Sequence, residues 1–157
     1  MSDYDVVLKT VPATLIASCT VTIPTNDQAS DYLGQAYGEV WTYFKGQGAK
    51  EAGPNIGIWH QAAEVLANEV AEAAVPIDRQ LPGTDRVKVY ELPSAQVVSA
   101  VHQGEFENFT RLHTVLLKWI EDNNYRIVGP YREVYIQHDP NNTANSATEV
   151  QYPVEKN

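Results

Sequence analysis

Hydrophobic and polar residues alternate in two stretches of the chain that share nearly the same pattern. Val6–Ser18 reads VVLKTVPATLIAS, and Val87–Ser99 reads VKVYELPSAQVVS. Alternation with a period of two is typical of a β-strand with one buried face. Pro12 and Pro93 stand at the same place in each stretch and cannot donate a ladder hydrogen bond. Each stretch therefore predicts a strand, a break at proline and a second strand.

A helical pattern follows each of these stretches. Apolar residues recur at intervals of three and four, which predicts an amphipathic helix. The two stripes are Leu33, Tyr37, Val40, Trp41 and Phe44, and Phe109, Leu112, Leu116, Trp119 and Ile120. Trp41 and Trp119 occupy matching places, and we expect both to pack in the core between helix and sheet.

Two more strands complete each half of the chain. The first is Asn55–His60 in one half and Tyr131–Gln137 in the other, each after a Gly-Pro pair. The last strand ends in EAAVP at 72–76 and in EVQYP at 149–153. The chain thus reads as β-α-β-β written twice. We predict an α+β fold of two units with pseudo-twofold symmetry, with two helices on one side of an antiparallel sheet and a ligand groove on the other.

One segment conflicts with the repeat. Residues 61–74, QAAEVLANEVAEAA, have high helix propensity. The repeat instead predicts a hairpin that turns near Ala67–Asn68, and we follow the repeat because tertiary context overrides local propensity.

The length of 157 residues suits one domain. Neither half alone would bury both faces of its sheet. We therefore expect a single intertwined domain over 1–157, with one half at about 4–78 and the other at about 86–156.

Charge and cysteine content narrow the function. Eleven basic and twenty acidic residues give a net charge of −9. This argues against non-specific nucleic-acid binding and against an anionic-membrane anchor, because both need clustered cations. Cys19 is the single cysteine, which excludes an internal disulfide, and we expect it to be a buried, unreactive thiol. With neither a membrane-length apolar run nor a signal-peptide pattern, we expect a cytoplasmic protein.

Common catalytic motifs are missing from the sequence. The four histidines are scattered, so we expect no metal site and no cofactor. The chain has neither a nucleophile elbow nor a phosphate-binding loop.

Glu133 is the strongest candidate for a functional residue. It lies inside the predicted strand Tyr131–Gln137, where alternation places Val134 and Ile136 on one face. We expect that apolar face to meet the helices. Glu133 and its tyrosine neighbours would then face away from the helices.

The first half of the repeat supports this interpretation. Gly57 and Trp59 correspond to Glu133 and Tyr135. A glycine opposite a carboxylate leaves space, and the two aromatic residues flank it. This arrangement predicts a concave aromatic slot with one anion at its floor.

Two segments resemble a known family. Gly129–Pro140, GPYREVYIQHDP, resembles the signature of the gyrase-inhibitor-like small-molecule-binding domain, and Val101–Phe109, VHQGEFENF, resembles its second strand-to-helix segment. This effector-binding module is attached to some AraC-type and MerR-type multidrug-responsive regulators and also occurs alone. The duplicated plan matches over residues 4–156. The resemblance implies two β-α-β-β units with helices on one side and a ligand groove on the other.

The resemblance also implies site residues. Glu133 matches the family's pocket glutamate, which pairs with lipophilic cations in multidrug binders, and Tyr135 matches the strand aromatic. Phe106 and Tyr37 fall near helix starts, where such pockets place aromatic residues. Trp59 is inferred from the repeat alone. The sequence contains no helix-turn-helix module, so we expect no direct nucleic-acid contact.

Three functions follow. The first is a stand-alone binding protein for hydrophobic cationic or aromatic small molecules. The second is a hydrolase of reactive electrophilic compounds that uses Glu133 and Tyr135 as an acid/base pair. The third is a gyrase-inhibitor-like interaction module that binds a protein partner through its acidic surface. A homodimer is left open.

Overall fold

The computed structural model divides the chain into two compact units. Unit 1 comprises Met1–Pro12 and Ser94–Asn157, and unit 2 comprises Ala13–Pro93. The structure describes residues 4–61, 67–103, 110–137 and 146–157. Each unit has its own helix and its own set of antiparallel strands.

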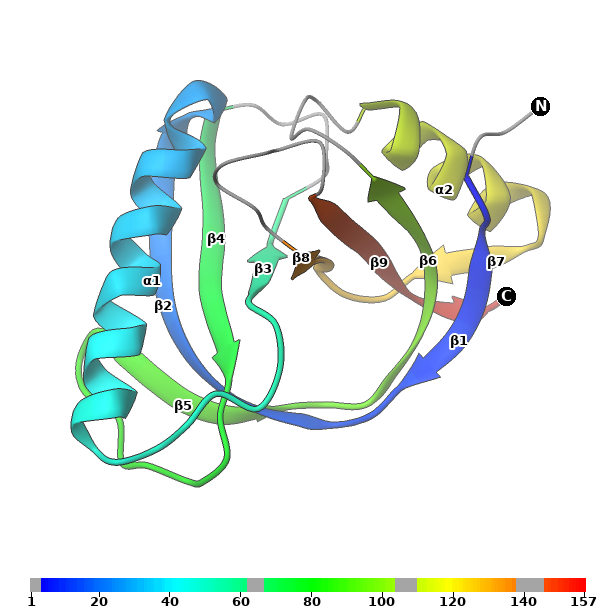
Figure 1. Ribbon diagram of the computed structural model, residues 1–157. Coiled ribbons are helices and arrows are strands. Elements are labelled where there is room, and N and C mark those ends of the chain that lie inside the picture. Colours follow the sequence, from blue (N-terminus) through cyan, green and yellow to red (C-terminus); the bar gives the residue numbers. More distant parts are fainter. Residues whose placement is uncertain (1–3, 62–66, 104–109, 138–145) are drawn as a thin grey trace. The chain divides into compact units, whose positions relative to one another are not determined.

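Unit 2 is a four-stranded antiparallel arrangement with one long helix against it. Its elements are β2 (Thr14–Thr25), the 3-10 turn η1 (Asn26–Gln28), α1 (Ala29–Gly46), β3 (Ile56–Trp59), β4 (Ala67–Pro76) and β5 (Val87–Leu92). The strand order is β3-β4-β2-β5. Figure 1 shows α1 running along β2 and β4, and its buried residues are Leu33, Ala36, Val40 and Phe44. The 3.6-residue spacing of these apolar side chains is what fixes the helix on the sheet.

Unit 1 repeats this plan with a shorter helix. Its elements are β1 (Val7–Val11), β6 (Ala95–Gln103), α2 (Thr110–Asp122), β7 (Tyr125–Ile127), β8 (Tyr131–Gln137) and β9 (Ala147–Lys156). The strand order is β1-β6-β9-β8, and β7 also pairs with β9. The buried side of α2 carries Leu112, His113, Leu116 and Ile120.

The strand registers confirm the predicted α+β fold with two β-α-β-β copies. Gly57 lies opposite Ala73 in unit 2, and Glu133 lies opposite Val150 in unit 1. Because Ala73 and Val150 stand at the same distance before the matching prolines at 76 and 153, Gly57 and Glu133 occupy equivalent positions. The predicted correspondence between them is therefore confirmed.

The segment with high helix propensity is partly described, and its described part is strand. Residues 67–74 belong to β4, which confirms that the repeat overrides propensity. The predicted turn position is wrong, however, because Ala67 and Asn68 are the first residues of the strand. Asn68 adopts a left-handed backbone with φ of 52°, a conformation that asparagine tolerates better than most residues. Residues 62–66 lie outside the described part.

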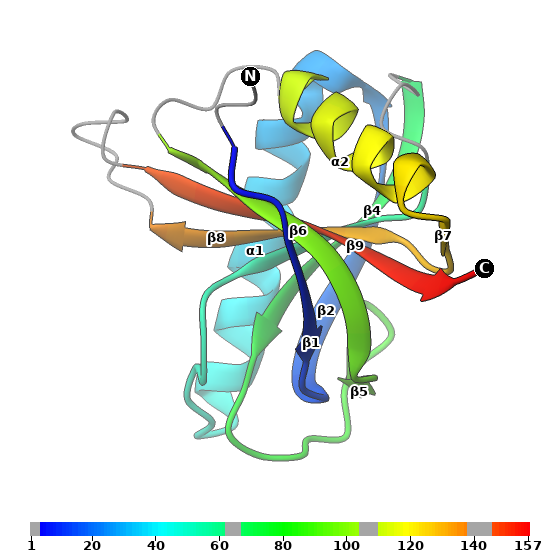
Figure 2. The same cartoon turned by 90° about the vertical axis from the view of Figure 1, so that its right-hand side faces the viewer.

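The first strand of each half crosses to the other unit. β1 pairs with β6 of unit 1, as Figure 2 shows, whereas β5 pairs with β2 of unit 2. Pro12 and Pro93 lie just outside the strands, between β1 and β2 and between β5 and β6. The two prolines are thus the points where the chain passes from one unit to the other. The single-domain organisation over 1–157 stays a prediction.

The two helix tryptophans lie at the margin of the packing. Trp41 and Trp119 are half-buried, so the expectation that they form the core is wrong. Trp41 stacks on Phe44 with ring centroids 4.9 Å apart, and the Lys45 ammonium lies 4.9 Å from the Trp41 ring. Aliphatic residues and Phe44 fill the deeper positions because they carry no polar atom that needs a partner. Among the described helices, none combines the length and apolar character needed to cross a membrane.

Candidate ligand-binding site

Glu133 is held in a buried position on β8. The residue is 8% exposed, which confirms the prediction that it is not on a solvated face. The Tyr135 hydroxyl donates a hydrogen bond to Glu133 Oε1 over 3.0 Å. A carboxylate in such a place is stabilised by hydrogen bonds or by an opposite charge, since its desolvation is costly. The geometry therefore joins two of the five predicted site residues.

An aromatic cluster on the same face of β8 includes a histidine of α2. The Tyr131 ring meets the His113 ring edge-on at 4.8 Å and lies 5.3 Å from the Tyr152 ring. His113 Nδ1 and the Tyr152 hydroxyl are 2.7 Å apart. The cluster forms a polar and aromatic wall on the face of β8 that also carries Glu133.

This cluster corrects the predicted orientation of β8. Val134 and Ile136 were expected to meet the helices, but Ile136 is 48% exposed and Tyr131 contacts α2 instead. The physical reason is His113, a polar ring on the buried side of α2 that finds hydroxyl and ring partners on this face. Alternation separates the two faces of a strand but does not show which one a helix covers.

The other predicted site residues lie in unit 2 or outside the described part. Trp59 is 6% exposed on β3. Tyr37 is in the middle of α1 rather than near its start, and its hydroxyl donates to the Ile56 carbonyl over 2.7 Å. Phe106 lies outside the described residues.

The sequence analysis missed a buried polar cluster around Glu72 in unit 2. Glu72 is 8% exposed on β4. The Ser18 hydroxyl donates to Glu72 Oε1 over 2.8 Å, and the Tyr90 hydroxyl donates to the same oxygen. His60 Nε2 lies 2.6 Å from Glu72 Oε2. The matching EAAVP and EVQYP segments mark the position of this glutamate, but not its partners.

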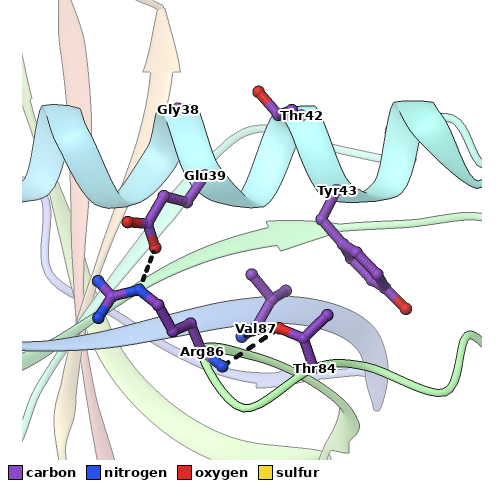
Figure 3. Close-up of a pocket in the computed structure, with 7 residues that line it drawn as sticks. All are labelled: Gly38, Glu39, Thr42, Tyr43, Thr84, Arg86 and Val87. Carbon is purple, nitrogen blue, oxygen red and sulfur yellow. Dashed lines mark hydrogen bonds and ion pairs between the residues drawn. The ribbon is translucent and has the colours of Figure 1, made fainter.

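A surface depression lies beside α1 in unit 2. It has a volume of about 470 Å³ and is lined by Gly38, Glu39, Thr42, Tyr43, Thr84, Arg86 and Val87 (Figure 3). Arg86 Nε donates to Glu39 Oε2 over 2.8 Å, and this bond holds the pKa of Glu39 below its ordinary value. The depression is open to solvent and its charges pair with each other, so it is a weaker candidate than the buried Glu133.

The cysteine is buried behind this ion pair. Cys19 is 1% exposed, as predicted, and its thiol donates to Glu39 Oε2 over 3.5 Å. Burial raises the pKa of Cys19, and the hydrogen bond with Glu39 adds to the effect. Within the described ranges, no group of three or more His, Cys, Asp or Glu side chains is arranged to hold a metal ion.

Comparison with protein families is decisive for the identity of the fold. The model of the GyrI-like small-molecule-binding domain matches residues 4–155. The chain belongs to this GyrI-like family. No curated protein has a matching sequence.

Solved structures of GyrI-like proteins share the architecture. The C-terminal domain of EcmrR matches with a TM-score of 0.87 at 21% identity, covering 99% of this chain and 100% of that one. EcmrR in its complex with DNA matches with a TM-score of 0.89 at 22% identity, covering 98% of this chain but 58% of EcmrR. SAV2435 bound to tetraphenylphosphonium matches with a TM-score of 0.63 at 13% identity, covering 98% and 94% of the two chains. At these identities the matches show a common fold.

Proposed function

We propose that this GyrI-like domain binds hydrophobic cationic or aromatic small molecules, with Glu133 as the counter-ion of the cation. The observation that carries the proposal is the burial of the Glu133 carboxylate next to a tyrosine hydroxyl and an aromatic wall. Tyr135, Tyr131 and Tyr152 are the aromatic residues nearest to it in the fold. Trp59, Tyr37 and Phe106 stay predictions.

The physical basis is the cost of burying an anion. Removing a carboxylate from water costs several kcal/mol unless a hydrogen bond or an opposite charge offsets it. The Tyr135 hydroxyl donates one hydrogen bond to the carboxylate. An organic cation adds an opposite charge at the same place, and each aromatic ring that it faces adds about 0.5–2 kcal/mol. Delocalised cations fit such a site best because they are weakly hydrated and lose little on entry.

The comparisons support the chemical class of the ligand. The family is defined as small-molecule binding, and SAV2435, of similar fold, has been solved with the lipophilic cation tetraphenylphosphonium. The chain spans 58% of EcmrR in its DNA complex, so transcription control is not carried over to it. The hydrolase and protein-interaction alternatives stay predictions from the sequence.

A single substitution tests the role of Glu133. We expect Glu133→Gln to weaken tetraphenylphosphonium binding about tenfold or more, equivalent to about 1.4 kcal/mol, because the amide keeps the shape but loses the charge. Binding of the neutral triphenylphosphine oxide should change little. Isothermal titration calorimetry with both compounds measures the difference.

A matched control is Glu121→Gln, which removes one exposed carboxylate from the α2 end of the same unit. It should leave both affinities at the wild-type value, since an exposed charge is screened by water and salt. Equal loss of affinity for the cation and the neutral compound in Glu133→Gln would mean that Glu133 acts by shape rather than by charge, and the proposed role would be wrong.

A further inference from the structure

The two repeats place a buried glutamate at the same position. Glu72 on β4 lies opposite Thr20 of β2, and Glu149 on β9 lies opposite Val101 of β6. Each glutamate stands four residues before the proline that ends its segment, and each is 8% exposed. The two units therefore carry a buried carboxylate at equivalent positions.

Both carboxylates lie on the face of their strands that points away from the helix of the unit. In unit 2, Cys19 contacts Glu39 of α1, whereas its neighbour Ser18 bonds to Glu72. In unit 1, the Tyr152 hydroxyl bonds to His113 of α2, so Tyr152 faces the helix. Glu149 stands three residues earlier on the same strand and therefore points to the opposite face. Glu72 and Glu149 are thus separate from the Glu133 site, which is on the helix side.

The two glutamates have different partners. Lys9 of β1 forms an ion pair with Glu149 at 2.6 Å. Lys9 lies opposite Val97, and the residue at the same place in unit 2 is Tyr90, which lies opposite Ile16. Lys9 and Tyr90 each stand three residues before the proline that follows their strand, Pro12 or Pro93. Where unit 1 has an ammonium group, unit 2 has a phenol.

Glu72 is consequently surrounded by hydrogen-bond donors without a permanent cation. Its partners are the hydroxyls of Ser18 and Tyr90 and the imidazole of His60, and in the described part of the chain no lysine or arginine forms an ion pair with it. Hydroxyl groups stabilise a carboxylate by hydrogen bonding but leave its charge in place. The His60 side chain is 37% exposed and Tyr90 is half-buried, so the solvent side of the cluster is formed by these two residues.

We propose that Glu72 is a second ligand site of this protein, and that it takes an alkylammonium group. Because the Tyr90 hydroxyl stands where the Lys9 ammonium stands in unit 1, the ligand's ammonium would displace that hydroxyl and take over its contact with Glu72 Oε1. Tyr90 would then present its ring to the cation, and the alkyl chain would extend past His60 toward solvent. This site is independent of Glu133 and of the proposed function.

The test uses hexylammonium chloride as the probe and 1-hexanol as its neutral counterpart. Titration of the full-length protein, followed by amide NMR shifts, should move signals of β4 and β5 with the ammonium but not with the alcohol. Tyr90→Lys builds the ammonium of unit 1 into unit 2, and we expect it to weaken hexylammonium binding at least tenfold. Glu133→Gln should leave the binding unchanged, which separates this proposal from the previous one.

Two further variants keep the test decisive. Lys9→Tyr replaces the ammonium beside Glu149 with the phenol that stands beside Glu72, and it should create a second hexylammonium site, with shifts in β6 and β9. If Tyr90→Lys does not fold, Glu72→Gln replaces it and should lose binding to the same extent. The proposal is overturned if wild-type protein does not bind hexylammonium or binds 1-hexanol equally well. It is also overturned if Tyr90→Lys, or Glu72→Gln in its place, binds like wild type, or if the shifts lie around Glu133.

Discussion

Among the buried glutamates of the described residues, three have partners of different kinds. Lys9 forms an ion pair with Glu149, the Tyr135 hydroxyl is one partner of Glu133, and two hydroxyls and an imidazole contact Glu72. A carboxylate paired with a lysine is already neutralised, whereas one bonded to hydroxyls keeps its charge. At the scale of single residues, both proposed cation sites therefore depend on which side chains contact the carboxylate.

Cys19 provides a prediction at the same scale. Because burial raises its pKa above the ordinary 9.0, the thiol stays protonated at pH 8, and the nucleophilic thiolate is scarce. We expect Cys19 in the folded protein to react with a disulfide reagent at pH 8 at least tenfold more slowly than it does in urea. The folded protein should still react more slowly than the unfolded chain at pH 9, because the raised pKa leaves it a smaller thiolate fraction at that pH. Absorbance of the released thiol measures both rates, and equal rates with and without urea would contradict the burial argument.

Sequence reasoning identified some of these residues and missed others for a physical reason. Glu133 was found because its strand has a local signature and a glycine counterpart in the repeat. The Glu72 cluster was missed because its partners are far apart in sequence, with Ser18 and Glu72 separated by 54 residues. The polarity of His113 gave no sign that α2 would bury it against tyrosines.

At the scale of elements, α1 contains glycines that serve no visible packing purpose. Gly34 and Gly38 lie inside the helix, and a Cβ added at either position would meet no atom within 4 Å. Glycine in a helix interior is less favourable than alanine by roughly 0.5–1 kcal/mol because it loses more backbone entropy on folding.

We therefore expect Gly34→Ala to stabilise the protein by about 0.5–1 kcal/mol. Urea unfolding followed by circular dichroism measures the change in unfolding free energy. Gly83→Ala is the matched control, since Gly83 has a φ of 79° and an added Cβ would lie 2.9 Å from the Val87 carbonyl oxygen. It should destabilise the protein. A loss of stability in Gly34→Ala would show that the helix face is covered by a neighbour.

The elements were the most predictable level of this fold. The repeat located both helices and eight of the strands, including β4, whose sequence on its own favours a helix. The strand β7 was not predicted because three residues are too short for a periodic pattern. The face of β8 that meets α2 could not be predicted either, since it depends on side chains of another element.

At the scale of the whole molecule, the crossing of β1 and β5 determines which parts are stabilised together. Phe44 is fully buried in unit 2, and Phe44→Ala should cost about 3–5 kcal/mol. We expect β5 to lose amide protection together with β2 and β4, while β1 keeps its protection with β6 and β9. Hydrogen exchange of the full chain measures this. Equal loss in β1 and β5 would show that the two units open as one, as the single-domain prediction requires.

The reciprocal exchange of β1 and β5 has a consequence for how such a protein can arise. A chain of half this length, carrying one copy of the repeat, could complete its sheet by trading its first strand with a second copy, which is a domain-swapped homodimer. Joining the two copies through residues 77–86 makes that trade intramolecular, so assembly no longer depends on protein concentration. In one joined chain each copy can differ from the other, and the lysine beside Glu149 and the tyrosine beside Glu72 are a difference of that kind.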